Sequence, residues 1–139
     1  MNEKCAAGTG RFLEVMARVL DCRLDQLSDL AAQGEPGVAI SSVCTVFAES
    51  EMISQLAGGQ SQADVALGAH LSIAKRIVGL GSRIGIVPPI AMTGGVALNH
   101  TLVNLLETKI GHKLLRMQNP QIMGALGAAR YALEMKRER

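Results

Sequence analysis

Apolar positions recur at helical spacing through the first half of the chain, whereas the second half also has short apolar runs that are typical of strands. Residues 10–20 carry one apolar stripe opposite a charged side, which predicts an amphipathic helix. The glycine- and proline-containing stretch at 31–39 predicts a connecting loop. A second helix is expected to follow Cys44 and to end at Gly58. A capping-box pattern predicts that a long third helix spans residues 61–80.

The second half of the chain alternates strand and helix patterns. The run "IAM" at 90–92 ends in "TGG", which is typical of a buried parallel strand that leads into a turn and a helix. That helix is expected over about 98–110 and should stop at Gly111. "HKLLRM" predicts a second strand and "IMGALGAARYALEMKR" a last helix. This order predicts a helix-rich α/β fold class with a small parallel sheet, in a single domain spanning residues 1–139.

Composition and charge narrow the function classes. The net charge is +2, and the chain has two Phe, one Tyr and no Trp. Nucleic-acid binding is not expected, because the net charge is too small and aromatic side chains for base stacking are almost absent. No apolar run approaches the roughly 20 residues that a membrane span requires. Three cysteines, an odd count, without secretory features predict a reducing, cytoplasmic location.

Two glycine-rich segments are candidates for ligand binding. "CAAGTGRF" is not a P-loop, because no Gly-Lys-Ser/Thr follows. It also lacks the dinucleotide fingerprint, because Leu13 stands at the position of the third glycine. "MTGGVALN" combines a strand end, a turn at Gly94 and Gly95, and a helix start. Exposed backbone N–H groups at such a start attract anions and let a nucleotide approach the backbone. The alternative is that the two glycines only make a tight turn.

Cys5 and Cys44 each lie directly before a predicted helix, where the helix dipole stabilises a thiolate or a bound anionic centre. Neither belongs to a C-x-x-C motif, and the three histidines have no ligand spacing, so one chain cannot readily close a zinc site. Two cysteines per chain, supplied twice across a two-fold axis, match the four thiolates of a 4Fe–4S cluster. The alternative is that both are small buried residues, as is expected for Cys22.

Four segments taken in order resemble one family: "NEKCAAGTGRFLE", "SSVCTVFAESE", "MTGGVALN" and "QIMGALGAARYA". They are similar to the activators of 2-hydroxyacyl-CoA dehydratases, a group that includes the ATPase subunits of benzoyl-CoA reductase. The resemblance implies part of a sugar kinase/Hsp70/actin-like (ribonuclease H-like) ATPase domain. It also implies a homodimer that shares one 4Fe–4S cluster at the subunit interface.

The resemblance assigns site residues motif by motif. Cys5 and Cys44 would be the metal ligands of the cluster. "TGGVALN" corresponds to the adenosine motif of the family, so ATP or ADP, with Mg²⁺, is the implied nucleotide. The implied nucleotide-binding residues are Gly94, Gly95, Asn99 and Gln118, with Gln121 as the alternative to Gln118.

The family carries both phosphate-binding motifs before the first of these segments, so this chain is expected to be the C-terminal half of an activator without the phosphate-binding N-terminal half. The implied function is ATP-coupled, low-potential electron transfer to a partner 2-hydroxyacyl-CoA dehydratase or related acyl-CoA reductase. Hydrolysis of ATP by this chain alone is not expected. One alternative is a non-catalytic, cluster-binding dimerisation module that needs a separately encoded N-terminal half. The other is a kinase-like nucleotide-binding remnant with packing cysteines.

Overall fold

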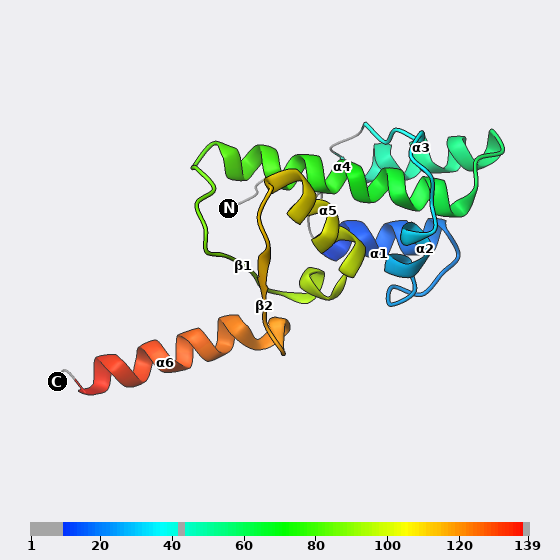
Figure 1. Cartoon of the computed structure of the whole chain (residues 1–139). Helices are drawn as coiled ribbons and strands as arrows, with labels where there is room; N and C mark the ends of the chain where they lie inside the picture. The colour runs from blue at the N-terminus through cyan, green and yellow to red at the C-terminus, as the bar shows by residue number, and fades with distance from the viewer. Residues whose placement is uncertain (1–9, 42–43, 138–139) are drawn as a thin grey trace.

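The computed structural model describes residues 10–41 and 44–137. These residues form the following elements, named as in Figure 1: α1 (Gly10–Val19), α2 (Leu27–Ala32), α3 (Thr45–Ala57), α4 (Gln62–Ser82), β1 (Ile90–Met92), the 3-10 turn η1 (Gly95–Leu98), α5 (His100–Ile110), β2 (Leu114–Arg116), the 3-10 turn η2 (Pro120–Ile122) and α6 (Met123–Arg137).

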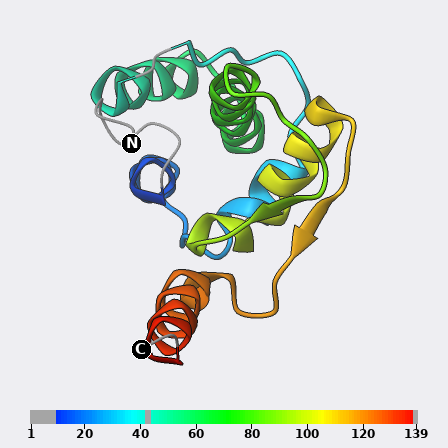
Figure 2. The ribbon, with the colours of Figure 1, turned by 90° about the vertical axis from the view of Figure 1, so that its left-hand side faces the viewer.

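The helices α1 to α5 form one body, and the long α4 runs along its upper side in Figure 1 (Figures 1 and 2). α4 packs against α2, α3 and α5, and α1 packs against α3. The apolar stripe predicted for the first helix is buried, since Phe12 is 1% exposed and Met16 is fully buried. Each of these helices therefore folds by placing its apolar side in a shared core.

Local sequence signals explain where α4 begins and how closely it packs. The Ser61 hydroxyl accepts a hydrogen bond from the Asp64 N–H at 3.0 Å, as the predicted cap requires. The Asp64 carboxylate accepts from the Glu35 N–H at 2.6 Å and so holds the preceding loop. In the middle of the helix, a Cβ on Gly68 would lie 2.5 Å from the Val38 carbonyl oxygen. Only glycine permits that approach of loop to helix.

Within the described residues, the only sheet has two parallel strands, β1 and β2, with Ile90 opposite Leu114. α5 connects them, so the predicted strand–helix–strand unit is confirmed. Three details differ from the sequence prediction. The strand β1 was expected to be buried, but Ala91 is exposed and Ile90 and Met92 are only half-buried. The six-residue α2 was not expected, and the helix predicted from residue 98 starts at His100, after the separate turn η1.

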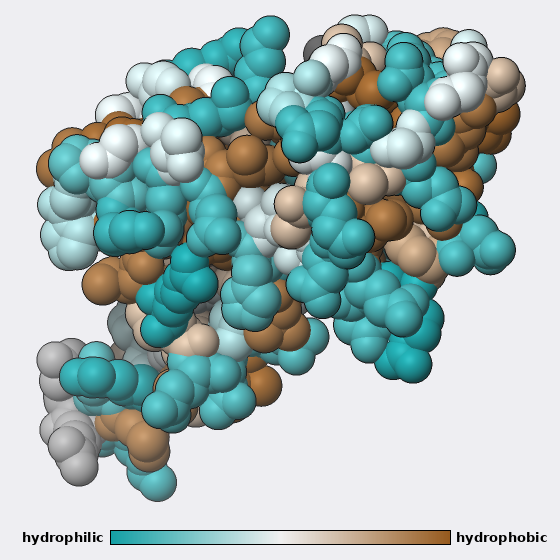
Figure 3. Space-filling model, turned by 45° about the vertical axis from the view of Figure 1, so that its right-hand side comes forward, coloured by the Kyte–Doolittle hydropathy of each residue, from teal (hydrophilic) through white to brown (hydrophobic). Residues whose placement is uncertain are grey.

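α6 extends away from the body, as both views show (Figures 1 and 2). Every residue from 124 to 136 is exposed. The exposed residues include four large apolar side chains: Leu126, Tyr131, Leu133 and Met135. Figure 3 shows such apolar residues among polar ones on this arm, at the lower left. An amphipathic helix normally buries its apolar side chains, so α6 has the surface of a helix that packs on something else.

A membrane role for the helices can be judged from their length and hydropathy. In the part of the chain that the structure describes, no helix is both long enough and apolar enough to cross a bilayer.

Candidate functional site

A cavity of about 880 Å³ lies between the start of α1, the α1–α2 loop, α2 and the turn η1. Its walls combine apolar, amide and charged side chains. The lining residues are Gly10, Leu13, Glu14, Arg23, Leu24, Asp25, Ser28, Asp29, Gly95, Val96, Leu98, Asn99, His100 and Gln121. The volume falls in the range of small-molecule and cofactor sites.

Glycine is required by the backbone conformation at Gly94 but not at Gly95. Gly94 has φ 89° and ψ 174°, a conformation that side chains disfavour strongly, and its N–H donates to the Pro120 carbonyl at 2.8 Å. Gly95 has no such constraint, since an added Cβ would lie at an ordinary 3.5 Å from Gln121 Nε2. Gly94 therefore makes the turn, while the missing side chain of Gly95 leaves room in the cavity.

Asn99 lines the cavity, but its side chain also acts inside the protein. Its Oδ1 accepts from the Leu102 N–H at 2.8 Å and caps α5. The preceding N–H of that helix, from Thr101, donates to the Ser28 hydroxyl at 3.0 Å. The sequence predicted exposed N–H groups for anions at this helix start. That expectation is wrong for these two groups, because protein side chains occupy them.

Charged residues stand on the wall opposite the turn. The Arg23 guanidinium donates to both oxygens of Asp25, at 3.0 and 2.6 Å. Its hydrogen bonds lower the pKa of Asp25, so that carboxyl is ionised near neutral pH. Glu14 is paired with Arg11 at 2.7 Å. These carboxylates have further lone pairs that can accept hydrogen bonds from hydroxyl or amino groups of a ligand.

The structure brings together some of the sequence-predicted site residues. Gly95, Asn99 and Gln121 line the cavity, and Gly94 precedes them in the same turn. Gln118 is exposed before η2 and is not among the lining residues, so Gln121 is the better candidate of the two. The acidic wall was missed in the sequence, where only the polar side of the first predicted helix pointed to Glu14.

Cys44 is the N-cap residue of α3, as the sequence predicted from the helix that follows it. Its backbone is extended, its carbonyl accepts from the Ala48 N–H at 2.9 Å, and its half-buried side chain makes no capping hydrogen bond. Cys5 lies outside the described residues. Among residues 10–41 and 44–137, no three His, Cys, Asp or Glu side chains are grouped for a metal.

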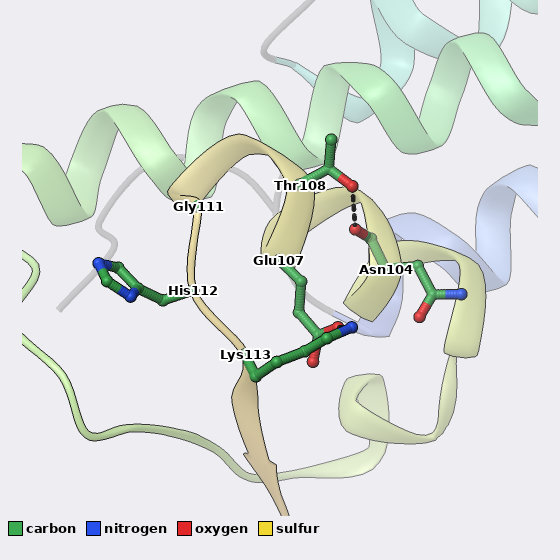
Figure 4. Close-up of a pocket in the computed structure, with 6 residues that line it drawn as sticks. All are labelled: Asn104, Glu107, Thr108, Gly111, His112 and Lys113. Atoms are coloured by element: carbon green, nitrogen blue, oxygen red, sulfur yellow. Dashed lines mark hydrogen bonds and ion pairs between the residues drawn. The ribbon is translucent and has the colours of Figure 1, made fainter.

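A second hollow of about 350 Å³ lies at the end of α5 (Figure 4). The Glu107 carboxylate fills its polar side, accepting from Lys113 Nζ at 2.6 Å and from the Leu114 N–H at 3.0 Å. Figure 4 shows that His112 points away from this pair. Because the charges satisfy one another, we assign this hollow a structural role: Glu107 ties α5 to β2.

The interactions of Glu107 with Lys113 and Leu114 predict that the protein loses stability in acid. The hydrogen bond from Lys113, followed by that from the Leu114 N–H, lowers the pKa of Glu107 below its ordinary 4.5. The folded state then binds fewer protons than the unfolded state in the interval below that value. The stabilisation is complete above pH 4.5 and is lost as the pH falls through the folded-state pKa. We expect the stability difference between wild type and Glu107→Gln to shrink in that interval.

Urea unfolding at several pH values between 7 and 3 measures this difference. Glu134→Gln is the matched control, since Glu134 forms an exposed pair with Arg130 on α6. The control should follow the wild-type pH dependence. A wild type and a Glu107→Gln variant with parallel profiles would contradict the assignment.

Comparisons with known proteins agree on one family. The model of the BadF/BadG/BcrA/BcrD ATPase family matches residues 1–132. The (R)-2-hydroxyglutaryl-CoA dehydratase activating ATPase of Acidaminococcus fermentans is 52% identical over 132 residues, which cover 95% of this chain and 51% of that protein. The activator of lactoyl-CoA dehydratase of Anaerotignum propionicum is 52% identical over 134 residues, which cover 96% of this chain and 52% of that protein.

The fold agrees as well. The solved activator of the 2-hydroxyisocaproyl-CoA dehydratase from Clostridium difficile, with bound ADPNP, matches with a TM-score of 0.89 at 44% identity. The match covers 99% of this chain and 51% of that one. The predicted fold class is confirmed, and the chain spans about half the length of the relatives it matches. The chain belongs to the BadF/BadG/BcrA/BcrD ATPase family.

Proposed function

We propose that this chain supplies the adenosine-binding and cluster-binding part of an ATP-driven activator. In this function, ATP binding and hydrolysis drive a low-potential electron to a 2-hydroxyacyl-CoA dehydratase or a related acyl-CoA reductase. The observation that carries the proposal is the cavity whose one wall is the "TGGVALN" turn. The solved relative with bound ADPNP and the activating ATPase of A. fermentans support a nucleotide as its ligand.

The chemistry of the cavity suits the base and sugar of an adenine nucleotide. Val96 and the half-exposed Leu98 offer apolar surface to a flat ring, and the bare backbone of Gly95 allows close approach. The carboxylates opposite accept hydrogen bonds from ribose hydroxyls or from the amino group of adenine. The lining carries three carboxylates, of Glu14, Asp25 and Asp29, against the one guanidinium of Arg23, and this net negative charge disfavours phosphates there. The chain therefore holds the uncharged part of the nucleotide.

We assign the phosphate and Mg²⁺ contacts to the half of the relatives' length that this chain does not cover. Two observations indicate that part of this chain's surface packs against that other half. α6 presents exposed apolar side chains such as Leu126 and Leu133. Among the described elements, the parallel sheet has only β1 and β2, and an isolated strand pair is marginally stable. The complementary half, in the same or a separate polypeptide, would cover both.

Cys44 fits a cluster ligand in two respects. It stands at the positive end of the 13-residue helix α3, which favours a negatively charged cluster. Its neighbours Val46 and Phe47 are 64% and 67% exposed, so the helix start offers apolar surface to a second chain. With Cys5, two copies provide the four thiolates that a 4Fe–4S cluster requires. The cluster would supply one-electron chemistry at low potential, in a homodimer that shares it.

The nucleotide assignment is tested by Gly95→Ala. The fold tolerates the added Cβ, which gives a methyl group to a residue that lines the space assigned to the nucleotide. We expect the unfolding midpoint to stay unchanged while the affinity for a fluorescent ADP, measured by titration with Mg²⁺, falls about tenfold. Gly79→Ala is the matched control, because Gly79 lies on α4 with open space around it.

Each proposed alternative gives a different result. If wild type binds no ADP alone but binds it after the complementary half of a relative is added, the chain is a module that depends on that half. If Gly95→Ala binds ADP as tightly as wild type, the two glycines only make a turn. A chain that binds ADP but never iron is the nucleotide-binding remnant.

A further inference from the structure

His70 is a polar residue at the centre of the apolar body. It lies in the middle of α4 and is fully buried. Its Nδ1 is 2.7 Å from the Ala66 carbonyl oxygen, one turn earlier in the helix. Its Nε2 is 2.9 Å from Nδ2 of Asn99, the residue that caps α5 and lines the cavity.

The hydrogen-bond partners determine the protonation state of the ring. The Leu102 N–H can only donate, so the Asn99 atom facing it is the oxygen Oδ1. Asn99 therefore directs its NH₂ group at His70, and Nε2 must accept. The Ala66 carbonyl can only accept, so Nδ1 carries the proton. The ring is neutral and protonated at Nδ1, and burial, which lowers the pKa of His70, favours the same state.

We propose that His70 is a positioning residue that fixes the side chain of Asn99, and through it the start of α5 and the turn that walls the cavity. This role rests on the proposed function for its effect on nucleotide binding. The residue acts through Asn99 and does not itself line the cavity. It joins α4 to the turn, and α4 also packs against α3, the helix that Cys44 caps.

A packing role alone does not explain a histidine here. An apolar side chain would fill the volume without the cost of burying two ring nitrogens. It would also leave the Asn99 amide, in a residue only 8% exposed, without its acceptor. Two variants separate these roles. Gln carries an NH₂ donor group and a carbonyl acceptor, which match the needs of Ala66 and Asn99, whereas Leu fills space only.

We expect His70→Leu to bind fluorescent ADP about tenfold more weakly than wild type, and His70→Gln to restore the affinity to within about threefold. Nitrogen-15 NMR of the imidazole should show a protonated Nδ1 and an unprotonated Nε2 at pH 7. Amide hydrogen exchange of the turn over residues 95–98 should be faster in His70→Leu and unchanged in His70→Gln. The last two readouts need no nucleotide.

These readouts separate the failure of this inference from that of the proposed function. If wild type shows the expected tautomer and the exchange pattern holds, but no variant binds ADP, the positioning role stands and the nucleotide assignment fails. A ring protonated at Nε2 overturns the positioning role. So does a His70→Leu variant with wild-type exchange in the turn, or with wild-type ADP affinity.

Discussion

Phe12→Ala should lower the free energy of unfolding by about 3–5 kcal/mol, which is a large part of the stability of a small domain. The side chain is 1% exposed and lies in the core formed by the helices of the body. Truncation removes the transfer energy of the ring and leaves a cavity that rigid neighbours fill only in part. Urea unfolding followed by circular dichroism measures the effect.

The chain supplies its own control for this truncation. Phe47 is the only other phenylalanine in the sequence, and it is 67% exposed on α3. Phe47→Ala removes the same atoms and should change stability by no more than about 0.5 kcal/mol. The two variants are compared at low protein concentration, so that self-association does not contribute. An equal loss of unfolding free energy in the two variants would mean that α1 does not pack as the structure describes.

Cys44→Ser should remove nearly all of the iron that the wild type binds. After anaerobic reconstitution, we expect about four irons per pair of wild-type chains, with the brown absorbance of a cluster. Serine replaces the thiolate with a poor ligand but is a preferred N-cap residue, so α3 should be as stable as before or more stable. Iron content and the unfolding midpoint are measured on the same preparation. Loss of iron with an intact midpoint separates a ligand from a packing residue.

Cys22→Ala is the matched control for that experiment. Cys22 packs against the core, and burial, with nearby Asp21 acting in the same direction, raises the pKa of its thiol. The thiolate that a cluster requires is therefore disfavoured, and the variant should keep its iron. Iron bound equally by wild type and Cys44→Ser would exclude Cys44 as a ligand. Iron lost from Cys22→Ala without unfolding would show that the wrong cysteine has been assigned.

The longer helices and both strands could be predicted because each carries its own periodicity and end signals. The α4 cap at Ser61 and the stop of α5 at Gly111, with φ 78°, are local features. α2 could not be predicted, since six residues are too few to show a helical period. The break between η1 and α5 depends on Asn99, which is held by His70 from 29 positions away. Such a contact leaves no local pattern.

The candidate site was predictable on one side only. The motif pointed to Gly94 and Gly95, and Gln121 was the alternative that the cavity favours. The opposite wall, with Asp25 and Asp29, comes from segments whose polar residues look like ordinary surface in the sequence. Hydrophobic periodicity shows which side of a helix is polar, but not which polar residues share a cavity. The roles of Cys5, outside the described residues, and of Cys44 stay predictions.

The exposed arm α6 has a consequence for folding cooperativity. A solitary helix of 15 residues is marginally stable in water, because nucleation is costly and no packing compensates it. The main contacts of α6 are with η2, so the core of the body contributes little to its order. The chain then contains two cooperative units, one that folds on its own core and one whose helicity depends on what binds it. The helical content of α6 would therefore report how fully that surface is occupied.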